Sequence, residues 1–235
     1  MRYFVVPQRI QQNTIIFTED QMHHMRKVLR LSKGDIVECF DNKGNLYKVK
    51  IVKLSRESSF GVVESFDVYD LNKNPKITLL QSYPTLLPKL DLVIEKCTEL
   101  GVDNFIFYKS KRSQFLAQPS DEKIQRWKKI AIKASEQSQR ITVPEIYTLQ
   151  NIAELDFSTY DSKLILYEKS ENQNKNFVKD FSNLIYAVGP EGGWENTEID
   201  LYRKENFTDI KPFNTILRTE TAPIAFTAIL KFLMG

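Results

Sequence analysis

The chain has 235 residues, of which 42% are hydrophobic and 27% charged, and its 8 Gly, 9 Pro and 15 Phe exclude the collagen-like and disordered classes. Its net charge of +3 is uneven, since residues 73–140 hold 13 Lys and Arg against 7 Asp and Glu, whereas residues 141–235 hold 9 against 14. No run approaches the roughly 18 uncharged apolar residues of a membrane helix, and the apolar run after Met1 is too short for a signal peptide. We therefore expect a cytoplasmic protein that makes no contact with a membrane.

Residues 1–72 are predicted to form a small β-barrel with one helix, at residues 19–31. A strand at 36–40 runs into the turn sequence Asp41-Asn-Lys-Gly-Asn45. After it, apolar residues at 47, 49 and 51 alternate with lysines, as in a half-buried strand, and another strand follows at 60–66.

Residues 73–235 are predicted to form an α/β domain, which begins within the polar connector 70–75. Strands alternate with helices from there on. The strands are expected at 77–80, 105–108, 164–167, 184–188 and 208–213, and the helices at 89–100, 121–140, 195–205 and 221–233. This alternation predicts a parallel sheet covered by helices on both faces, with ligands bound beyond the carboxyl ends of the strands.

The helix predicted at 121–140 has one basic side. At about 100° per residue, Arg126, Lys129, Lys133 and Arg140 fall within a narrow stripe opposite the apolar face. Such a stripe is typical of a phosphate-contacting surface, although exposed helix faces are often basic without binding anything.

A glycine-rich loop, Gly189-Pro-Glu-Gly-Gly193, follows the strand at 184–188 and precedes a helix. It matches neither nucleotide-phosphate fingerprint, and Glu191 places a negative charge where a phosphate would lie. The loop therefore favours a neutral or cationic ligand held by backbone groups. A tight structural turn is the alternative.

A second loop, Ile216-Leu-Arg-Thr-Glu-Thr-Ala222, opens the last predicted helix. Arg218 and Glu220 stand there at the expected edge of the sheet. Capping of the helix by Thr219 or Thr221, with a glutamate in the first turn, is the structural alternative. That alternative gives no reason for an arginine at a helix N-terminus.

Residues that usually bind transition metals are scarce. Cys39 and Cys97 stand outside any C-x-x-C spacing, and we expect each to be a small buried apolar group. The histidines are the adjacent pair His23 and His24. We therefore expect no metal site.

Short motifs run along nearly the whole chain: His24-x-x-x-Val28-Leu-Arg-Leu31 with Gly34-Asp35, Lys89, Lys96-x-x-Glu-Leu-Gly-Val102, Arg112-Ser, Trp127-x-x-Ile-Ala131, Glu136-Gln-Ser-x-Arg140 with Pro144, Gly189-Pro-Glu-Gly-Gly193 and Leu217-Arg-Thr-Glu-Thr-Ala222. In this order and spacing they resemble the RsmE family, the bacterial 16S rRNA uridine N3-methyltransferases of the SPOUT superfamily.

The resemblance implies that residues 1–72 are a PUA-like β-barrel that helps bind RNA. Residues 73–235 would be a SPOUT methyltransferase domain tied in a deep trefoil knot, through which the protein forms a homodimer. The implied reaction is methylation of N3 of a uridine in 16S rRNA of the small ribosomal subunit. S-adenosylmethionine (AdoMet), bound in the knot by three loops, is the implied cofactor.

Roles for individual residues are expected from the chemistry of the implied reaction, from the three loops and from the basic residues. Arg218, oriented by Glu220, is expected to be catalytic, because a cation near the uracil oxygens favours the base without its N3 proton. The cofactor contacts are expected from Leu166, Tyr167, Glu168, Gly189, Pro190, Glu191, Gly192, Gly193, Phe213, Ile216, Leu217, Arg218, Thr221 and Ala222. RNA contacts are expected from Arg2, Arg9, Arg26, Arg30, Arg112, Arg126, Lys129, Lys133 and Arg140, although Arg30 could instead cap the helix before it.

The chain departs from the family pattern at one place. Phe213-Asn-Thr215 stands where the family usually has Gly-x-Arg, which puts an aromatic ring near the expected adenosine site and removes a positive charge. Two other functions stay open: an RNA-binding protein that has kept the fold without the activity, and a nucleotide enzyme, which would lack a phosphate loop.

Overall fold

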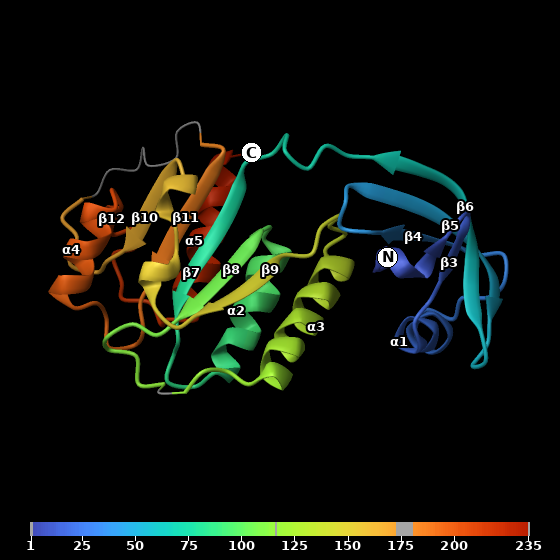
Figure 1. Cartoon of the computed structure of the whole chain (residues 1–235), viewed down its shortest axis with the longest axis horizontal. Coiled ribbons are helices and arrows are strands. Elements are labelled where there is room, and N and C mark those ends of the chain that lie inside the picture. The colour runs from blue at the N-terminus through green and yellow to red at the C-terminus, as the bar shows by residue number, and fades with distance from the viewer. Residues whose placement is uncertain (1, 116, 173–180, 235) are drawn as a thin grey trace. The chain divides into compact units, whose positions relative to one another are not determined.

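A computed structural model describes residues 2–115, 117–172 and 181–234 (Figure 1). The chain forms two compact units, residues 1–73 with 135–143 and residues 74–134 with 144–235. The sequence patterns predict that every residue from 73 on belongs to the second domain. Residues 135–143 instead bond to the first unit, where the Phe4 N–H donates to Glu136 (2.9 Å) and the Val143 N–H donates to Asn42 Oδ1 (2.6 Å).

The first unit is built on one six-stranded sheet with the strand order β1-β4-β5-β6-β3-β2. The strands are β1 (Arg2–Phe4), β2 (Ile10–Gln11), β3 (Thr14–Ile16), β4 (Ile36–Phe40), β5 (Asn45–Leu54) and β6 (Ser59–Val68). Alternate apolar side chains of these strands bury a core, because successive side chains of a strand point to opposite faces. That core consists of Tyr3, Val5, Ile15, Phe17, Met25, Val37, Cys39, Val49 and Ile51.

The helix predicted at 19–31 is shorter than expected. Helix α1 (Glu19–His23) begins at a Thr18 capping box and continues as a π-helix over His24–Val28, and a 3-10 turn (Pro7–Arg9) precedes it. Arg30 lies beyond this helix with φ +56°, in the left-handed region that few residues other than glycine adopt. The reversal of the backbone there ends the helix before Leu31. Strands β1, β2 and β3 were not predicted, because each is at most three residues long.

The second unit is a six-stranded sheet in which every pair of neighbouring strands is parallel, with the order β12-β10-β11-β7-β8-β9. The strands are β7 (Lys76–Ser82), β8 (Asn104–Tyr108), β9 (Glu145–Leu149), β10 (Ser162–Leu166), β11 (Asn183–Val188) and β12 (Thr208–Ile210). The helices are α2 (Pro88–Glu99), α3 (Asp121–Gln137), α4 (Asn196–Lys204) and α5 (Thr221–Met234), with 3-10 turns at Ile152–Glu154 and Phe157–Thr159.

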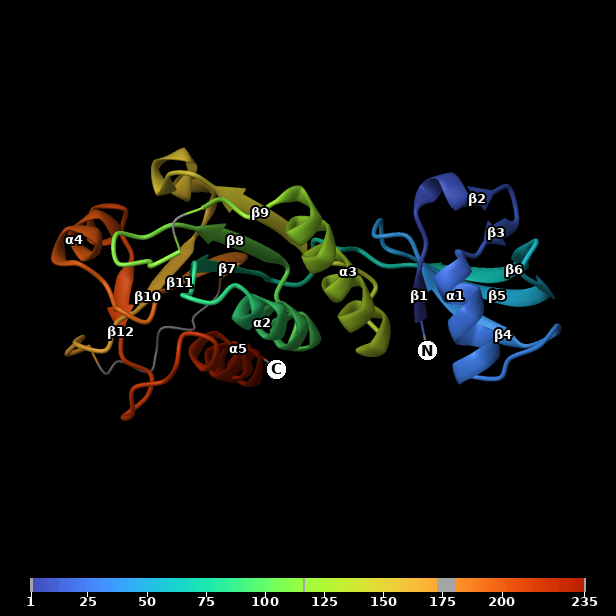
Figure 2. The same ribbon diagram turned by 90° about the horizontal axis from the view of Figure 1, so that it is seen from below.

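Helices cover both faces of this sheet, as predicted. On one face Ile185 and Ala187 of β11 share a core with Ile199 and Tyr202 of α4. On the other, Tyr186 meets Phe226 of α5 (ring centroids 5.1 Å apart), and Figure 2 shows α2 and α5 side by side along this face. The expected fold class, an α/β domain with a parallel sheet preceded by a small β-rich unit, is confirmed, while the trefoil knot stays a prediction.

Two elements of this unit end earlier than predicted. Strand β12 ends at Ile210, so Phe213 lies in the following loop. Helix α3 ends at Gln137, and Gln139 has φ +59°. Arg140 is therefore not on the helix, and its place in the basic stripe was wrong. Strand β9 was not predicted. No helix in the described part of the chain has the length and apolar character needed to span a bilayer.

Candidate functional site

A cavity of about 750 Å³ opens at the carboxyl ends of β10, β11 and β12, which are neighbours in the sheet. The loops after these strands supply most of its wall, as expected for ligands of parallel sheets. The cavity is lined by Lys89, Leu166, Tyr167, Glu168, Val188, Gly189, Pro190, Glu191, Gly192, Gly193, Trp194, Lys211, Pro212, Phe213, Asn214, Thr215, Ile216, Leu217, Arg218, Thr219 and Ala222.

The glycine-rich loop presents bare backbone to this cavity. Gly193 has φ +67°, and its N–H donates to the Pro190 carbonyl (3.0 Å) in a tight turn. A Cβ on Gly189 would come within 3.0 Å of the indole of Trp194, whose Nε1–H donates to the Leu166 carbonyl (2.9 Å). The loop therefore forms the tight turn, and its backbone also lines the cavity, while its binding of a ligand stays a prediction.

Thr219 connects the glycine-rich loop to the loop before α5. Its hydroxyl donates to the Gly189 carbonyl (2.7 Å) and accepts a hydrogen bond from Gln81 Nε2 (2.9 Å), at the end of β7. Both Thr219 and Gln81 are buried. The hydroxyl of Thr219 therefore joins two loops of the cavity, and its bonds are not those of a helix cap.

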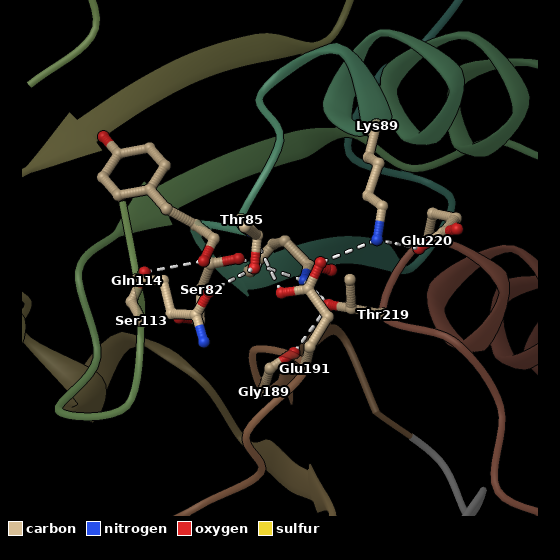
Figure 3. Close-up of polar contacts among 11 residues, drawn as sticks. Ser82, Thr85, Lys89, Ser113, Gln114, Gly189, Glu191, Thr219 and Glu220 are labelled. Atoms are coloured by element: carbon tan, nitrogen blue, oxygen red, sulfur yellow. Dashed lines mark hydrogen bonds and ion pairs between the residues drawn. The ribbon is translucent and has the colours of Figure 1, made fainter. Parts of the chain in front are cut away.

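Charged side chains meet at one wall of the cavity (Figure 3). Lys89, at the start of α2, lies 2.7 Å from Glu191 and 3.3 Å from Glu220. The other oxygen of Glu191 accepts from the Thr85 N–H (3.0 Å). Partial burial raises the pKa of Glu191, but the bonds from Lys89 and from backbone N–H groups outweigh it and hold that pKa below the ordinary value. The same bond to Glu191 raises the pKa of Lys89.

Arg218 does not make the contact expected for it. Glu220 was predicted to orient this guanidinium, and the structure pairs Glu220 with Lys89 instead. Within the described residues, Arg218 is exposed and its side chain has no ion pair or hydrogen bond. It reaches the cavity as an uncommitted cation.

The predicted cofactor contacts come together in space. Every one of them lines the cavity except Thr221, which belongs to the first turn of α5. Phe213 and Thr215, where the chain departs from the family pattern, line it as well. Lys89 and Gln81 were not predicted as site residues. Lys89 had appeared among the family motifs, but its partner Glu191 is 102 residues away, so no local pattern indicated the pairing.

The residues predicted to contact RNA differ in whether their side chains already make ion pairs or hydrogen bonds within the protein. Arg2 forms an ion pair with Glu38, and Arg126 forms one with Asp91. Three others donate hydrogen bonds: Arg9 to the Phe17 carbonyl, Arg112 to the Gly192 carbonyl, and Arg140 to the Thr142 hydroxyl. The remaining predicted RNA contacts are Arg26, Arg30, Lys129 and Lys133. Their side chains are exposed and make no polar contact among the described residues.

Cys39 and Cys97 are buried free thiols, as predicted, and burial raises the pKa of both. In the described part of the chain, no group of three or more His, Cys, Asp or Glu residues could hold a metal ion.

Two protein-family models match the chain. A family model described as an RNA methyltransferase domain matches residues 72–231. The chain belongs to the RNA methyltransferase family. A second model, described as an RNA methyltransferase PUA domain, matches residues 17–64, within the first unit. The resemblance drawn from the sequence motifs is therefore confirmed.

Relatives within the RNA methyltransferase family match along nearly their whole length. Proteins named ribosomal RNA small subunit methyltransferase E from Bacillus subtilis and Mesomycoplasma hyopneumoniae are 29% and 30% identical, over 97% and 95% of this chain and 95% of each relative. The crystal structure of the protein of that name from Neisseria gonorrhoeae, bound to S-adenosyl methionine, matches with a TM-score of 0.85 at 27% identity, covering 100% of this chain and 98% of that one.

Proposed function

We propose that this chain transfers a methyl group from AdoMet to N3 of a uridine in 16S rRNA of the small ribosomal subunit. Membership of the RNA methyltransferase family and relatives named for the small-subunit RNA support the reaction class. The observation that carries the proposal is the cavity itself, where bare glycine backbone and carboxylates stand beside the uncommitted guanidinium of Arg218.

The residues of the cavity fit AdoMet. Its volume is within the roughly 300–1,000 Å³ of small-molecule sites. Gly189 and Gly192 have no room for a side chain, since a Cβ on them would lie 3.0 Å from Trp194 and 3.2 Å from Arg112, so the loop lines the cavity with bare backbone. The Glu168 carboxylate suits a cationic ligand, and Phe213, Leu166 and Leu217 offer apolar surface to an adenine ring.

AdoMet, when bound, supplies a methyl group on a positively charged sulfur. The loops at 166–168, 189–193 and 213–222 would hold it, because their backbone groups converge on one cavity. Holding donor and acceptor in line can contribute about 7–11 kcal/mol to a transfer between two molecules. These loops therefore act mainly by orientation.

Arg218 is the proposed catalytic residue. The acceptor nitrogen must lose its proton, and a guanidinium beside the uracil oxygens stabilises the negative charge that this leaves. Because Arg218 has no acidic partner among the described residues, its positive charge is available to the uracil ring of the substrate. We assign Glu220 an indirect part, through Lys89, in place of a contact with Arg218.

RNA binding would be shared between the two units. The PUA domain match supports a role for the first unit, where Arg26 and Arg30 are exposed, and Lys129 and Lys133 on α3 would add phosphate contacts. We further propose that the protein works in the cytoplasm as a homodimer formed through the α/β unit.

The decisive experiment maps N3-methyluridine in 16S rRNA by mass spectrometry in a strain lacking this gene, with and without a plasmid copy. The modification should be absent from the deletion strain and restored by the wild-type copy. An unchanged modification pattern in the deletion strain would refute the proposed substrate.

Because Phe213 lines the cavity where the family usually has glycine, a non-catalytic RNA-binding protein is the second candidate. Calorimetry with AdoMet separates the two functions. Absence of binding by a folded protein that still binds RNA would favour the second candidate.

A further inference from the structure

Lys89 occupies an unusual position for a surface lysine. It is in the first turn of α2, where a positive charge opposes the helix dipole. Its Nζ nevertheless lies within ion-pair distance of two carboxylates from different segments, Glu191 of the glycine-rich loop and Glu220 of the loop before α5 (Figure 3). One ammonium group thus connects three elements that are separate in the sequence.

The two carboxylates need this cation. The Glu220 side chain is only 13% exposed, and its Oε2, the atom nearest Lys89, is buried without a hydrogen-bond partner among the described residues. Without Lys89, Glu191 and Glu220 would be like charges close together, which repel each other and push the two loops apart. The Thr85 N–H holds only the far oxygen of Glu191.

We propose that Lys89 is a positioning residue of the cofactor site. By bridging Glu191 and Glu220, it fixes the position of the loop at 189–193 relative to the loop at 216–222. The bridge also engages Glu220, so that the neighbouring Arg218 keeps its charge for the substrate. Lys89 itself needs no contact with the reacting atoms.

The first measurement needs no activity. Carboxyl titration by carbon-13 NMR of the ligand-free protein should show a higher pKa for Glu191 in K89M than in the wild type, because Met keeps the apolar stem and removes only the charge. K96M is the matched control, since Lys96 is also on α2 and also pairs with two glutamates, Glu95 (2.7 Å) and Glu99 (2.9 Å), away from the cavity. An unchanged Glu191 pKa in K89M would overturn the bridge.

The second measurement rests on the proposed function, because it uses AdoMet binding by calorimetry. K89M should bind about three- to tenfold more weakly, as expected when one partner of a half-buried ion pair is removed. K89R should recover most of the affinity, because a guanidinium can bridge two carboxylates. The double variant K89M/E220Q should bind more tightly than K89M, since it no longer has two facing charges.

The outcomes separate the two proposals. Wild-type affinity in K89M, or a double variant that binds no better than K89M, would overturn the positioning role. A wild-type protein that binds no AdoMet would instead refute the proposed function, and the NMR titration would still decide whether Lys89 forms the bridge.

Discussion

Two clusters of ion pairs begin two residues apart on α2. At Lys89 the cluster gathers carboxylates from the loops of the cavity. At Asp91 it gathers Lys123, Arg126 and the indole N–H of the fully buried Trp127, all from α3. Residues two apart point about 200° from each other around a helix, so α2 uses one side for the site and the other for packing.

The two clusters use the same chemistry, and we expect the first to serve function and the second to serve stability. The Asp91 cluster fastens two helices through a carboxylate whose side chain is only 17% exposed. The Lys89 cluster fastens loops that also line a cavity. Breaking each cluster should therefore affect a different measurement.

The largest effect is expected at Arg218, whose side chain has no ion pair among the described residues. Arg218→Ala should lower kcat by roughly 10²–10³-fold, the usual cost of removing one group that stabilises developing charge. Radiolabelled methyl transfer to small-subunit RNA measures it. Arg203→Ala is the control, because Arg203 is an exposed arginine of α4 that pairs with Asp209 and lines no part of the cavity. Equal rates for the two variants would exclude Arg218 from catalysis.

The second cluster should respond in stability. Asp91→Ala leaves the Trp127 N–H and two cations without their acceptor, and should lower the free energy of unfolding by about 1–3 kcal/mol. Urea denaturation measures this change. Glu95→Ala, which breaks an exposed pair of the same helix, should cost at most about 1 kcal/mol. A loss of AdoMet affinity in Asp91→Ala without a loss of stability would contradict the division between the clusters.

A smaller effect is expected on RNA binding. Because Asp91 already engages Arg126, we expect the proposed phosphate contacts of α3 to come from Lys129 and Lys133. Replacing both by Ala should weaken RNA binding and make the salt dependence shallower by about 1–2 in the log–log slope. Titrations of labelled RNA at several salt concentrations measure it, with Lys96→Ala as the control. An unchanged slope would remove α3 from the RNA surface.

The smallest effect is the pH dependence of the first cluster. The pKa of Glu191 is below its ordinary 4.5, so its contribution to stability is complete above 4.5 and is lost as the pH falls through the lowered value. The pKa of Lys89 is above its ordinary 10.5, so its contribution is lost only as the pH rises through the raised value. The difference in Tm between wild type and K89M should therefore not change with pH between 4.5 and 10.5, and it should decrease at acid pH as Glu191 becomes protonated. A difference that persists after the Glu191 carboxyl has become protonated, as followed by carbon-13 NMR, would argue against the bridge.

Local sequence patterns predicted the elements that have a long repeat or a strong turn. The strand at 36–40 and the helices near 89–100 and 221–233 came within one residue of their observed ends, because their apolar spacing matches one structure only. Strands β1 to β3 were missed because each has at most three residues. Strand β9 was missed although it has five residues; it is an edge strand whose partner β8 lies far back in the chain.

In the site, too, some features could be predicted from local sequence and others depend on the tertiary structure. The sequence by itself determined the three loops, because glycine spacing and the position after a strand are local properties. Only the tertiary structure decided that Glu220 pairs with Lys89, which leaves Arg218 without an acidic partner among the described residues. It also decided that Thr219 bonds both to Gly189 and to Gln81, which lies 138 residues before Thr219 in the chain. The order β12-β10-β11 does not follow the order of the strands in the chain, so which loops meet, and which charges pair, depends on how the sheet is assembled.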